Sequence, residues 1–348
     1  MDCMHPERMM NLSNEVIDTE EQLIARMTTP SPAVVSAVSA LDGPVLILGA
    51  GGKMGPTLAE LLVKAGAEVY GVARFSEPGL AEYLGKIGVK VITMDLMSEE
   101  GLDTLPDVPN VLVLVGFKFG SASNPATTWA VNAALPGRLV ERYRDARIVY
   151  LSSGNVYPFS SIGSGGSTER DTVGPVGEYA QSRLGGERIA EYTAAKQGTP
   201  LLIVRLFYAT ELRYGIIRDI VDKVSNGAPI DLSTGYVNQI WQGDANSYLA
   251  RSFPLCSNPA KIINVVGPET LSVRDIAQQV GDLLNVAPRF VESECDTALL
   301  GNANSLIHEL GFNETSVKQM IQWTVHWVTI GGRSLGKPTK YEKRTGKF

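Results

Sequence analysis

The chain has 348 residues, 44% of them hydrophobic, and its mean hydropathy is +0.02, as expected for a globular protein of one large or two smaller domains. Its 31 basic and 37 acidic residues give a net charge of −6, which argues against nucleic acid as a partner. The three cysteines and three histidines are scattered without zinc spacing, so we expect neither a metal site nor a disulfide framework.

Residues 1–41 precede any strand-like pattern and form an N-terminal extension. They lack the basic and apolar regions of a secretory signal, and no apolar run in the chain reaches 18 residues, so we expect a cytoplasmic protein without a membrane partner. Within the extension, 20–27 and 33–41 predict two short helices. We expect their many apolar side chains to dock on the rest of the chain or on a neighbouring subunit.

Short runs rich in Val, Ile and Leu recur from residue 45 onwards. They lie at 45–49, 67–73, 89–95, 110–116, 147–153 and 200–207. Helical patterns lie between them, at 54–66, 124–145 and 178–198. Continuous apolar strands are typical of a parallel sheet covered on both faces. The alternation predicts an α/β fold with a Rossmann-type doubly wound parallel sheet.

The chain divides into further parts after the N-terminal extension. Residues 42–207 form the predicted NAD(P)-binding Rossmann domain. The alternation then becomes irregular, and 208–330 is mainly a smaller substrate-binding region with returning Rossmann elements. The last part, 331–348, holds six Lys or Arg and one Glu. We expect this basic tail to be a solvated or loosely docked end.

The sequence GAGGKMG (49–55) stands between the first predicted strand and the helix after it. Gly49 permits the tight turn, Gly52 lets the backbone approach a pyrophosphate, and Gly55 packs the helix against the strand. This placement predicts a dinucleotide site, which also includes Lys53 and Met54, rather than a merely structural glycine turn.

The second predicted strand ends with Ala73 and Arg74. No carboxylate stands there to hold the ribose 2′-hydroxyl of NAD, whereas a guanidinium suits the 2′-phosphate of NADP. We therefore expect NADP, with NAD as the second choice. The alternative is that Arg74 is a surface arginine opening a loop.

Together these features resemble the extended short-chain dehydrogenase/reductase family, which includes nucleotide-sugar epimerases and dehydratases. The resemblance covers about residues 43–330. It rests on GAGGKMG (49–55), DL (95–96), GFK (116–118), Asn132, LSSGNVYP (151–158), YAQSR (179–183), VRLFY (204–208) and NVVGPETLSV (264–273). It implies an NAD(P)-dependent oxidoreductase or epimerase that transfers a hydride at a sugar hydroxyl. Family members often form dimers through two long helices, here 124–143 and 175–196.

The resemblance also implies the catalytic residues. Tyr179 would be the acid/base, and Ser153 would hold the same substrate oxygen. Arg183 stands where the family has a lysine that binds the nicotinamide ribose and favours the phenolate form of the tyrosine. Either Arg183 takes over that role, or the site is impaired and the protein only binds cofactor. A third interpretation makes Tyr179 a helix-surface residue.

Four further positions follow from the resemblance. Asp95 and Leu96 would lie beside the adenine, and Lys118 would lie near the cofactor phosphates or ribose. Asn132 would support the active-site strand. Asp95 could instead cap a helix, and Asn132 could be a buried amide with satisfied hydrogen bonds.

The substrate region departs from the family pattern. Gly154 and Asn155 replace the Asp-Glu pair of the dehydratases, so we do not expect dehydration. Tyr208 replaces an asparagine, and 236–244 lacks the arginine that grips a nucleotide diphosphate. A smaller hydroxylated or carboxylated compound is therefore as plausible as a nucleotide sugar. The proposed substrate-binding residues are Asn155, Tyr208, Gln239 and Trp241.

Two questions stay open at this level. Arg213 and Arg218 could meet an anion or could be ordinary exposed helix charges. The competing class is a non-catalytic dinucleotide-binding protein, acting as a redox sensor or scaffold, for which Arg183 and the unmatched N-terminal extension are the support.

Overall fold

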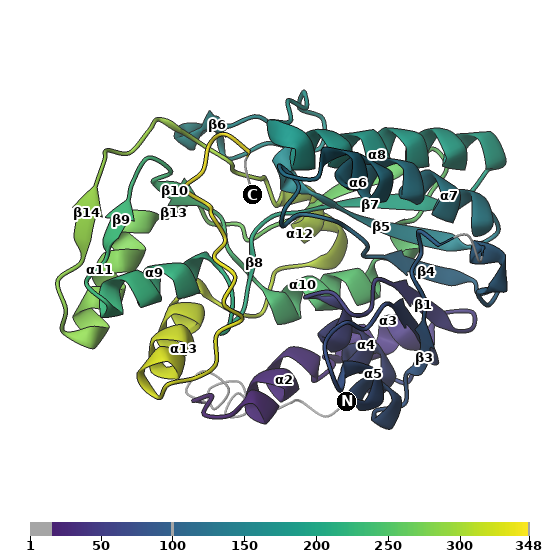
Figure 1. Cartoon of the computed structure of the whole chain (residues 1–348), viewed down its shortest axis with the longest axis horizontal. Helices are drawn as coiled ribbons and strands as arrows, with labels where there is room; N and C mark the ends of the chain where they lie inside the picture. The colour runs from purple at the N-terminus through teal and green to yellow at the C-terminus, as the bar shows by residue number, and fades with distance from the viewer. Residues whose placement is uncertain (1–15, 99–100, 347–348) are drawn as a thin grey trace.

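The computed structural model describes residues 16–98 and 101–346. A seven-stranded sheet forms its centre, with the order β12-β7-β5-β4-β1-β2-β3 (Figure 1). All its strand pairs are parallel. The strands are β1 (Val45–Leu48), β2 (Val69–Ala73), β3 (Lys90–Thr93), β4 (Asn110–Val113), β5 (Arg147–Ser153), β7 (Leu201–Leu206) and β12 (Lys261–Val265). The predicted Rossmann-type doubly wound α/β fold is confirmed, and β12 is one of the elements that return to it.

Both faces of the sheet are covered, as the continuous apolar strands predicted. Side chains of a strand alternate between the faces, so Val45 and Ile47 of β1 point to one core and Leu46 and Leu48 to another. The first core is shared with α3 (Pro32–Ser39), α4 (Gly55–Lys64), α5 (Leu80–Lys86) and α10 (Gln242–Arg251). The second is shared with α7 (Leu135–Arg142) and α8 (Gly177–Gln197).

The segment 124–145 differs from the single helix expected there. It consists of α6 (Pro125–Trp129), a π-helical turn (Ala130–Ala134) and then α7. Pro136 has no N–H to donate to the carbonyl of Asn132, four residues earlier, which breaks the regular α-helical ladder. The hydroxyl of Tyr150 donates to that carbonyl at 3.4 Å.

A smaller lobe lies beside the sheet (Figure 1). Its helices are α9 (Ile216–Ser225), α11 (Val273–Leu284) and α13 (Val317–Thr329), with α12 (Asn304–Leu310) returning towards β12. Its short strands pair as β9 (Pro229–Asp231) with β14 (Arg289–Val291), β10 (Tyr236–Val237) with β13 (Leu271–Ser272), β8 (Ala209–Thr210) with β11 (Ile240–Trp241), and β6 (Ser160–Ser161) with β15 (Thr297–Ala298). Among the described helices, none has the length and apolar character needed to cross a bilayer.

The N-terminal extension packs against both lobes. Helix α2 (Glu20–Thr28) begins at a capping box of Thr19 and Gln22, and it buries Leu23 and Met27 in the core of the smaller lobe. Helix α3 buries Val34 and Val38 in the first core of the sheet. Residues 1–15 of the predicted extension lie outside the described part of the chain.

Candidate active site

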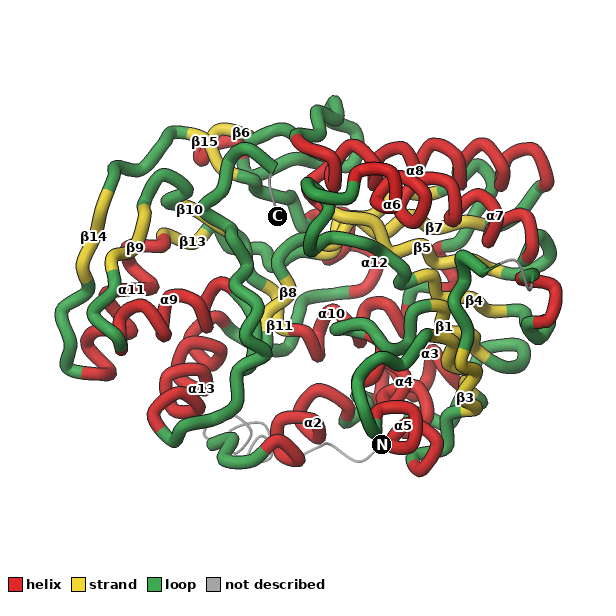
Figure 2. Tube along the Cα trace, viewed as in Figure 1, coloured by secondary structure: helices red, strands yellow, loops and turns green. Residues whose placement is uncertain are grey.

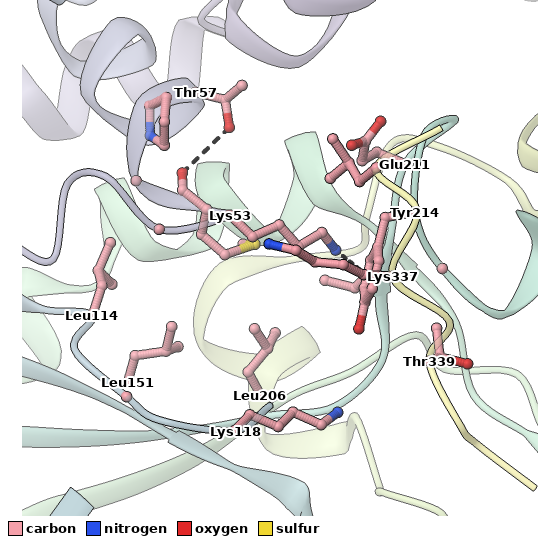
Figure 3. A pocket seen from close by; sticks show the side chains of 18 of the residues that line it. Lys53, Thr57, Leu114, Lys118, Leu151, Leu206, Glu211, Tyr214, Lys337 and Thr339 are labelled. Atoms are coloured by element: carbon pink, nitrogen blue, oxygen red, sulfur yellow. Dashed lines mark hydrogen bonds between the residues drawn. The ribbon is translucent and has the colours of Figure 1, made fainter. Parts of the chain in front are cut away.

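A cavity of about 810 Å³ lies between the carboxyl ends of the central strands and the smaller lobe (Figure 3). This is the usual place for a ligand in an open α/β sheet. Most of the predicted site residues line it together: Gly49, Gly52, Lys53, Met54, Gly55, Lys118, Ser153, Asn155, Tyr179, Arg183 and Tyr208.

The glycine loop connects β1 to α4 at one side of the cavity. Gly49 has φ of +98°, which favours glycine. At Gly55 a Cβ would lie 2.4 Å from the carbonyl oxygen of Ala50, so the helix can approach the strand only with glycine there. The loop, the start of α4 and the volume of the cavity fit a dinucleotide.

Lys53 points away from the glycine loop. Its Nζ donates to the carbonyl of Ala209 at 2.7 Å and lies 4.2 Å from the ring centroid of Tyr214 (Figure 3). Burial lowers its pKa to about 7; Glu211 opposes this shift, and the nearby cations Lys118 and Arg213 add to it. The loop lysine therefore connects the Rossmann domain to the smaller lobe and brings a cation into the cavity.

Helix α8 carries the predicted catalytic residues Tyr179 and Arg183. Tyr179 lines the cavity. Arg183, one turn later, is only 3% exposed. Its guanidinium donates to the carbonyl of Val115 at 2.9 Å and also to that of Leu151, and it lies 5.1 Å from the ring centroid of Tyr150. Arg183 thus ties α8 to the carboxyl ends of two central strands.

Ser153 ends β5 and lines the cavity beside Asn155. Its hydroxyl donates to Oδ1 of Asn155 at 3.1 Å and accepts from the backbone N–H of Asn155 at 3.2 Å. Gly154 between them packs against Phe207, whose ring would lie 2.6 Å from any added Cβ. Ser153 therefore has a fixed position at the end of the strand.

A buried network supports this strand end. Glu187 of α8 accepts from the hydroxyl of Ser152 at 2.5 Å and pairs with Arg205 of β7 at 2.7 Å. Arg205 also donates to the hydroxyl of Tyr157 at 2.7 Å. These residues fix α8 against β5 and β7. Ser152, Tyr157 and Arg205 lie in motifs quoted above, but sequence reasoning gave them no role because their partner Glu187 lies outside those motifs.

Asn132 does not line the cavity. Its amide accepts from the N–H of Phe117 at 2.7 Å and donates to the carbonyl of Phe117 and to the hydroxyl of Ser182, both at 3.0 Å. It is the satisfied buried amide that was considered as the alternative. Its partners nevertheless belong to the loop of Lys118 and the helix of Tyr179.

Arg74, Asp95 and Leu96 lie outside the cavity. Nη1 of Arg74 is 3.9 Å from the carboxylate of Asp95, and both side chains are exposed. The Asp95 carboxylate accepts from the N–H of Met97 at 3.0 Å, so it stabilises a turn there rather than the helix start considered as the alternative. Leu96 is buried in the core of the sheet.

The structure corrects two of the predicted substrate-binding residues. Trp241 is 1% exposed and packs edge-on against Trp323, with ring centroids 5.5 Å apart, so it is a core residue. Gln239 is 2% exposed and donates to the carbonyl of Asn238. Neither lines the cavity, because Trp241 of β11 and Gln239 just before that strand are both buried in the protein interior.

Arg213 and Arg218 are both paired with carboxylates. Arg213 contacts Glu20 at 2.9 Å and Glu211 at 3.1 Å, and Arg218 contacts Asp222 at 2.9 Å. Their charges are therefore balanced within the protein. Among the described residues, no group of three or more His, Cys, Asp or Glu could hold a metal ion.

The end of the chain is an ordered segment, contrary to the expected solvated or loosely docked tail. Residues 331–346, here called the strap, run between the two lobes without helix or strand (Figure 2). The strap buries Tyr341 to 3% exposure, and Thr339 bonds Asp219 of α9 through both its N–H and its hydroxyl. Arg333, Lys337 and three neighbours line the cavity. The sequence interpretation considered only the charges of this segment and did not predict that Tyr341 would be buried.

Shortening Tyr341 should loosen the strap. We expect Tyr341→Ala to lower the free energy of unfolding by about 2 kcal/mol through lost burial and to speed the release of a bound dinucleotide. Tyr341→Phe is the matched control, because the buried hydroxyl has no hydrogen-bond partner among the described residues. Thermal unfolding and a cofactor-release trace give both values. Equal release rates in the two variants would show that the strap is no barrier.

Three comparisons place the chain among known proteins. Residues 45–217 match the model of the NAD dependent epimerase/dehydratase family. No curated relative matches the sequence.

Several solved structures share the fold. MoeE5 in complex with UDP-glucuronic acid and NAD has a TM-score of 0.69 at 20% identity, covering 83% of this chain and 100% of that one. UDP-glucuronic acid 4-epimerase from Bacillus cereus, in complex with NAD, has 0.69 at 16%, covering 82% and 98%. The Bordetella bronchiseptica enzyme WbmG, in complex with NAD, has 0.71 at 16%, covering 86% and 98%. At these identities the likeness establishes the fold.

Proposed function

Because residues 45–217 match the model of the NAD dependent epimerase/dehydratase family, we propose that the protein is an NAD(P)-dependent oxidoreductase or epimerase acting on a hydroxyl of a sugar or sugar-like molecule. One observation carries the proposal: Tyr179, Ser153 and the glycine loop line the same cavity. A nicotinamide dinucleotide bound there would accept or return the hydride. Tyr179 would take the hydroxyl proton onto its phenolate oxygen, while Ser153 holds the same substrate oxygen.

The cavity favours a substrate with an acidic group. Lys53 of the glycine loop and Lys337 of the strap both line the cavity (Figure 3). Within the described residues, neither ammonium group forms an ion pair with a carboxylate. Burial opposes the charge of Lys53, so a bound carboxylate or phosphate would offset that cost. A sugar acid and a nucleotide sugar both offer such a group, and the solved structures with this fold include complexes with UDP-glucuronic acid.

A substrate panel tests this function. Purified protein, supplied with NAD or NADP, would be offered neutral sugars, sugar acids, sugar phosphates and UDP-sugars. Nicotinamide absorbance reports oxidation, and chromatography of the sugars reports epimerisation. We expect turnover with at least one acidic class and less with its neutral counterpart. Tight cofactor binding without turnover on any class would favour the non-catalytic dinucleotide-binding alternative.

Cofactor choice gives a separate prediction. Arg74 is 69% exposed at the end of β2, near Asp95, where it can reach a 2′-phosphate. We expect NADP to bind more tightly than NAD, and Arg74→Ala to cost NADP on the order of 1.5–3 kcal/mol while sparing NAD. Arg138→Ala, an exposed arginine on α7, is the control. Calorimetric titration measures all four affinities, and equal affinities in the parent protein would contradict the choice.

We also propose a cytoplasmic homodimer built through the segment 124–143 and helix α8. The support is a set of exposed apolar side chains on these elements, namely Trp129 and Ile189 at 41% and Tyr192 at 70% exposure. Exposed apolar groups of this size mark many protein interfaces.

A further inference from the structure

The motif position that the family fills with lysine holds a side chain that is already engaged elsewhere. The guanidinium of Arg183 donates to the carbonyl of Val115, just beyond the end of β4, and to that of Leu151 near the end of β5, and it lies against the ring of Tyr150. A Cβ on Gly116 would lie 2.9 Å from its Nη1, so the surrounding backbone leaves it little room to turn. Arg183 therefore has a structural role that a lysine, with its single ammonium, could not fill in the same way.

A different lysine lies beside the tyrosine. Nζ of Lys118 is 5.8 Å from the ring centroid of Tyr179, within the range of a cation–π contact. Both side chains line the cavity. Lys118 comes from the loop after β4, and Figure 3 shows its side chain extending along one side of the cavity. A positive charge at this place stabilises the phenolate more than the neutral phenol.

One buried side chain, Asn132, connects the backbone segments that carry Lys118 and Tyr179. Asn132 binds both backbone groups of Phe117, the residue before Lys118. Its amide also donates to the hydroxyl of Ser182, which in turn donates to the carbonyl of Tyr179 at 2.9 Å. The distance between Lys118 and Tyr179 is thus set by a network of hydrogen bonds in the core.

We propose that Lys118 supplies a second positive charge, beside that of Arg183, that supports proton transfer by Tyr179. The role usually given to one lysine is divided in this chain: Arg183 anchors helix α8, and Lys118 approaches the ring of Tyr179 from the loop after β4. The proposal rests on the proposed function, since it concerns the same proton transfer.

The pH dependence follows from the surroundings of Lys118. Burial lowers its pKa to about 8. The charged groups that share its cavity are the cations Lys53, Arg183, Arg213, Arg333 and Lys337 and the carboxylates Glu20, Glu60, Glu77 and Glu211; the tyrosines are Tyr83, Tyr179, Tyr208 and Tyr214. The ammonium is fully present below about pH 8 and is lost above it, so the support for the phenolate should weaken on the alkaline side. An arginine at this position would keep its charge there.

The test compares Lys118→Met, Lys118→Arg and a control, Lys86→Met, whose lysine is 72% exposed on α5. The ultraviolet absorbance of phenolate is titrated without substrate in each protein and in its Tyr179→Phe counterpart, and the difference isolates Tyr179. We expect the Tyr179 phenolate to form at higher pH in Lys118→Met than in the parent or the control. At about pH 7, turnover should fall at least tenfold in Lys118→Met, and in Lys118→Arg activity should extend to higher pH than in the parent.

The outcomes separate the two proposals. A Tyr179 titration that is unchanged in Lys118→Met would overturn the inference, and one that then moves in Arg183→Met would assign the role to Arg183 alone. A titration that moves as expected, in a protein without turnover on any substrate, would support the inference about the charge while the proposed function fails.

Discussion

Arg183→Met should lower the free energy of unfolding by about 3 kcal/mol, because it leaves the carbonyls of Val115 and Leu151 without a donor in a buried place. Part of this loss in stability is offset, because the buried guanidinium, only 3% exposed, no longer has to be removed from water on folding. The remaining loss should be large because helix α8 depends on this contact to reach the ends of β4 and β5. Denaturant unfolding followed by circular dichroism measures the change.

Two further variants show whether the change in stability comes from the guanidinium contacts of Arg183. Arg188→Met removes an arginine from the same helix, but its side chain is 54% exposed and pairs only with Glu191, so its effect should stay within about 0.5 kcal/mol. Arg183→Lys keeps a charged donor but lacks the guanidinium fork that spans both carbonyls, so its stability should fall between those of the other two variants. A melting curve of Arg183→Met that matches the Arg188→Met curve would show that the guanidinium contacts add nothing to stability.

Tyr179→Phe should reduce turnover by about 10²–10⁴-fold, the usual contribution of a general acid or base. The ring remains, so its packing and its contact with Lys118 change little, and cofactor affinity should stay close to that of the parent. Tyr192→Phe is the control, since Tyr192 lies on the same helix with 70% exposure.

Steady-state kinetics on the best substrate of the panel, with cofactor affinity measured separately, distinguishes chemistry from binding. If turnover and affinity fell together in Tyr179→Phe, the tyrosine would be a binding residue. If neither fell, the proton would move through another group.

The predicted parts of the fold are those that local pattern determines. Each of the runs from 45–49 to 200–207 contains a strand of the sheet, because strands covered on both faces are mainly apolar; β3, at the edge, is only partly buried. The glycine loop was predictable for a similar reason: at Gly55 only glycine lets the helix approach the strand. Segments 1–15, 99–100 and 347–348 lie outside the described residues.

What the sequence did not reveal depends on contacts between distant segments. Trp241 was expected to offer a stacking surface in the substrate site, but the packing of α13 places Trp323 against it. The strap reads as a charged tail because its basic residues outnumber its one buried aromatic, Tyr341, which decides its position.

The direction of a side chain is the other gap. The four-residue spacing of Tyr179 and Arg183 correctly puts them on one face of α8, yet the guanidinium turns to backbone carbonyls. Lys118 is separated from Tyr179 by about sixty residues, and only the parallel order of β4 and β5 brings its loop beside α8. The residue spacing along α8 could not show that a lysine from another segment lies beside Tyr179.

A single-turnover experiment tests the central claim most directly. Protein with oxidised cofactor bound would be mixed with the best substrate of the panel, and the absorbance of reduced nicotinamide followed in the parent and in Tyr179→Phe. The proposed function predicts a rapid rise in the parent, transient in an epimerase and lasting in a dehydrogenase, and a rise slowed by at least 10²-fold in the variant. Cofactor that binds tightly to both proteins but is never reduced by any substrate would contradict it.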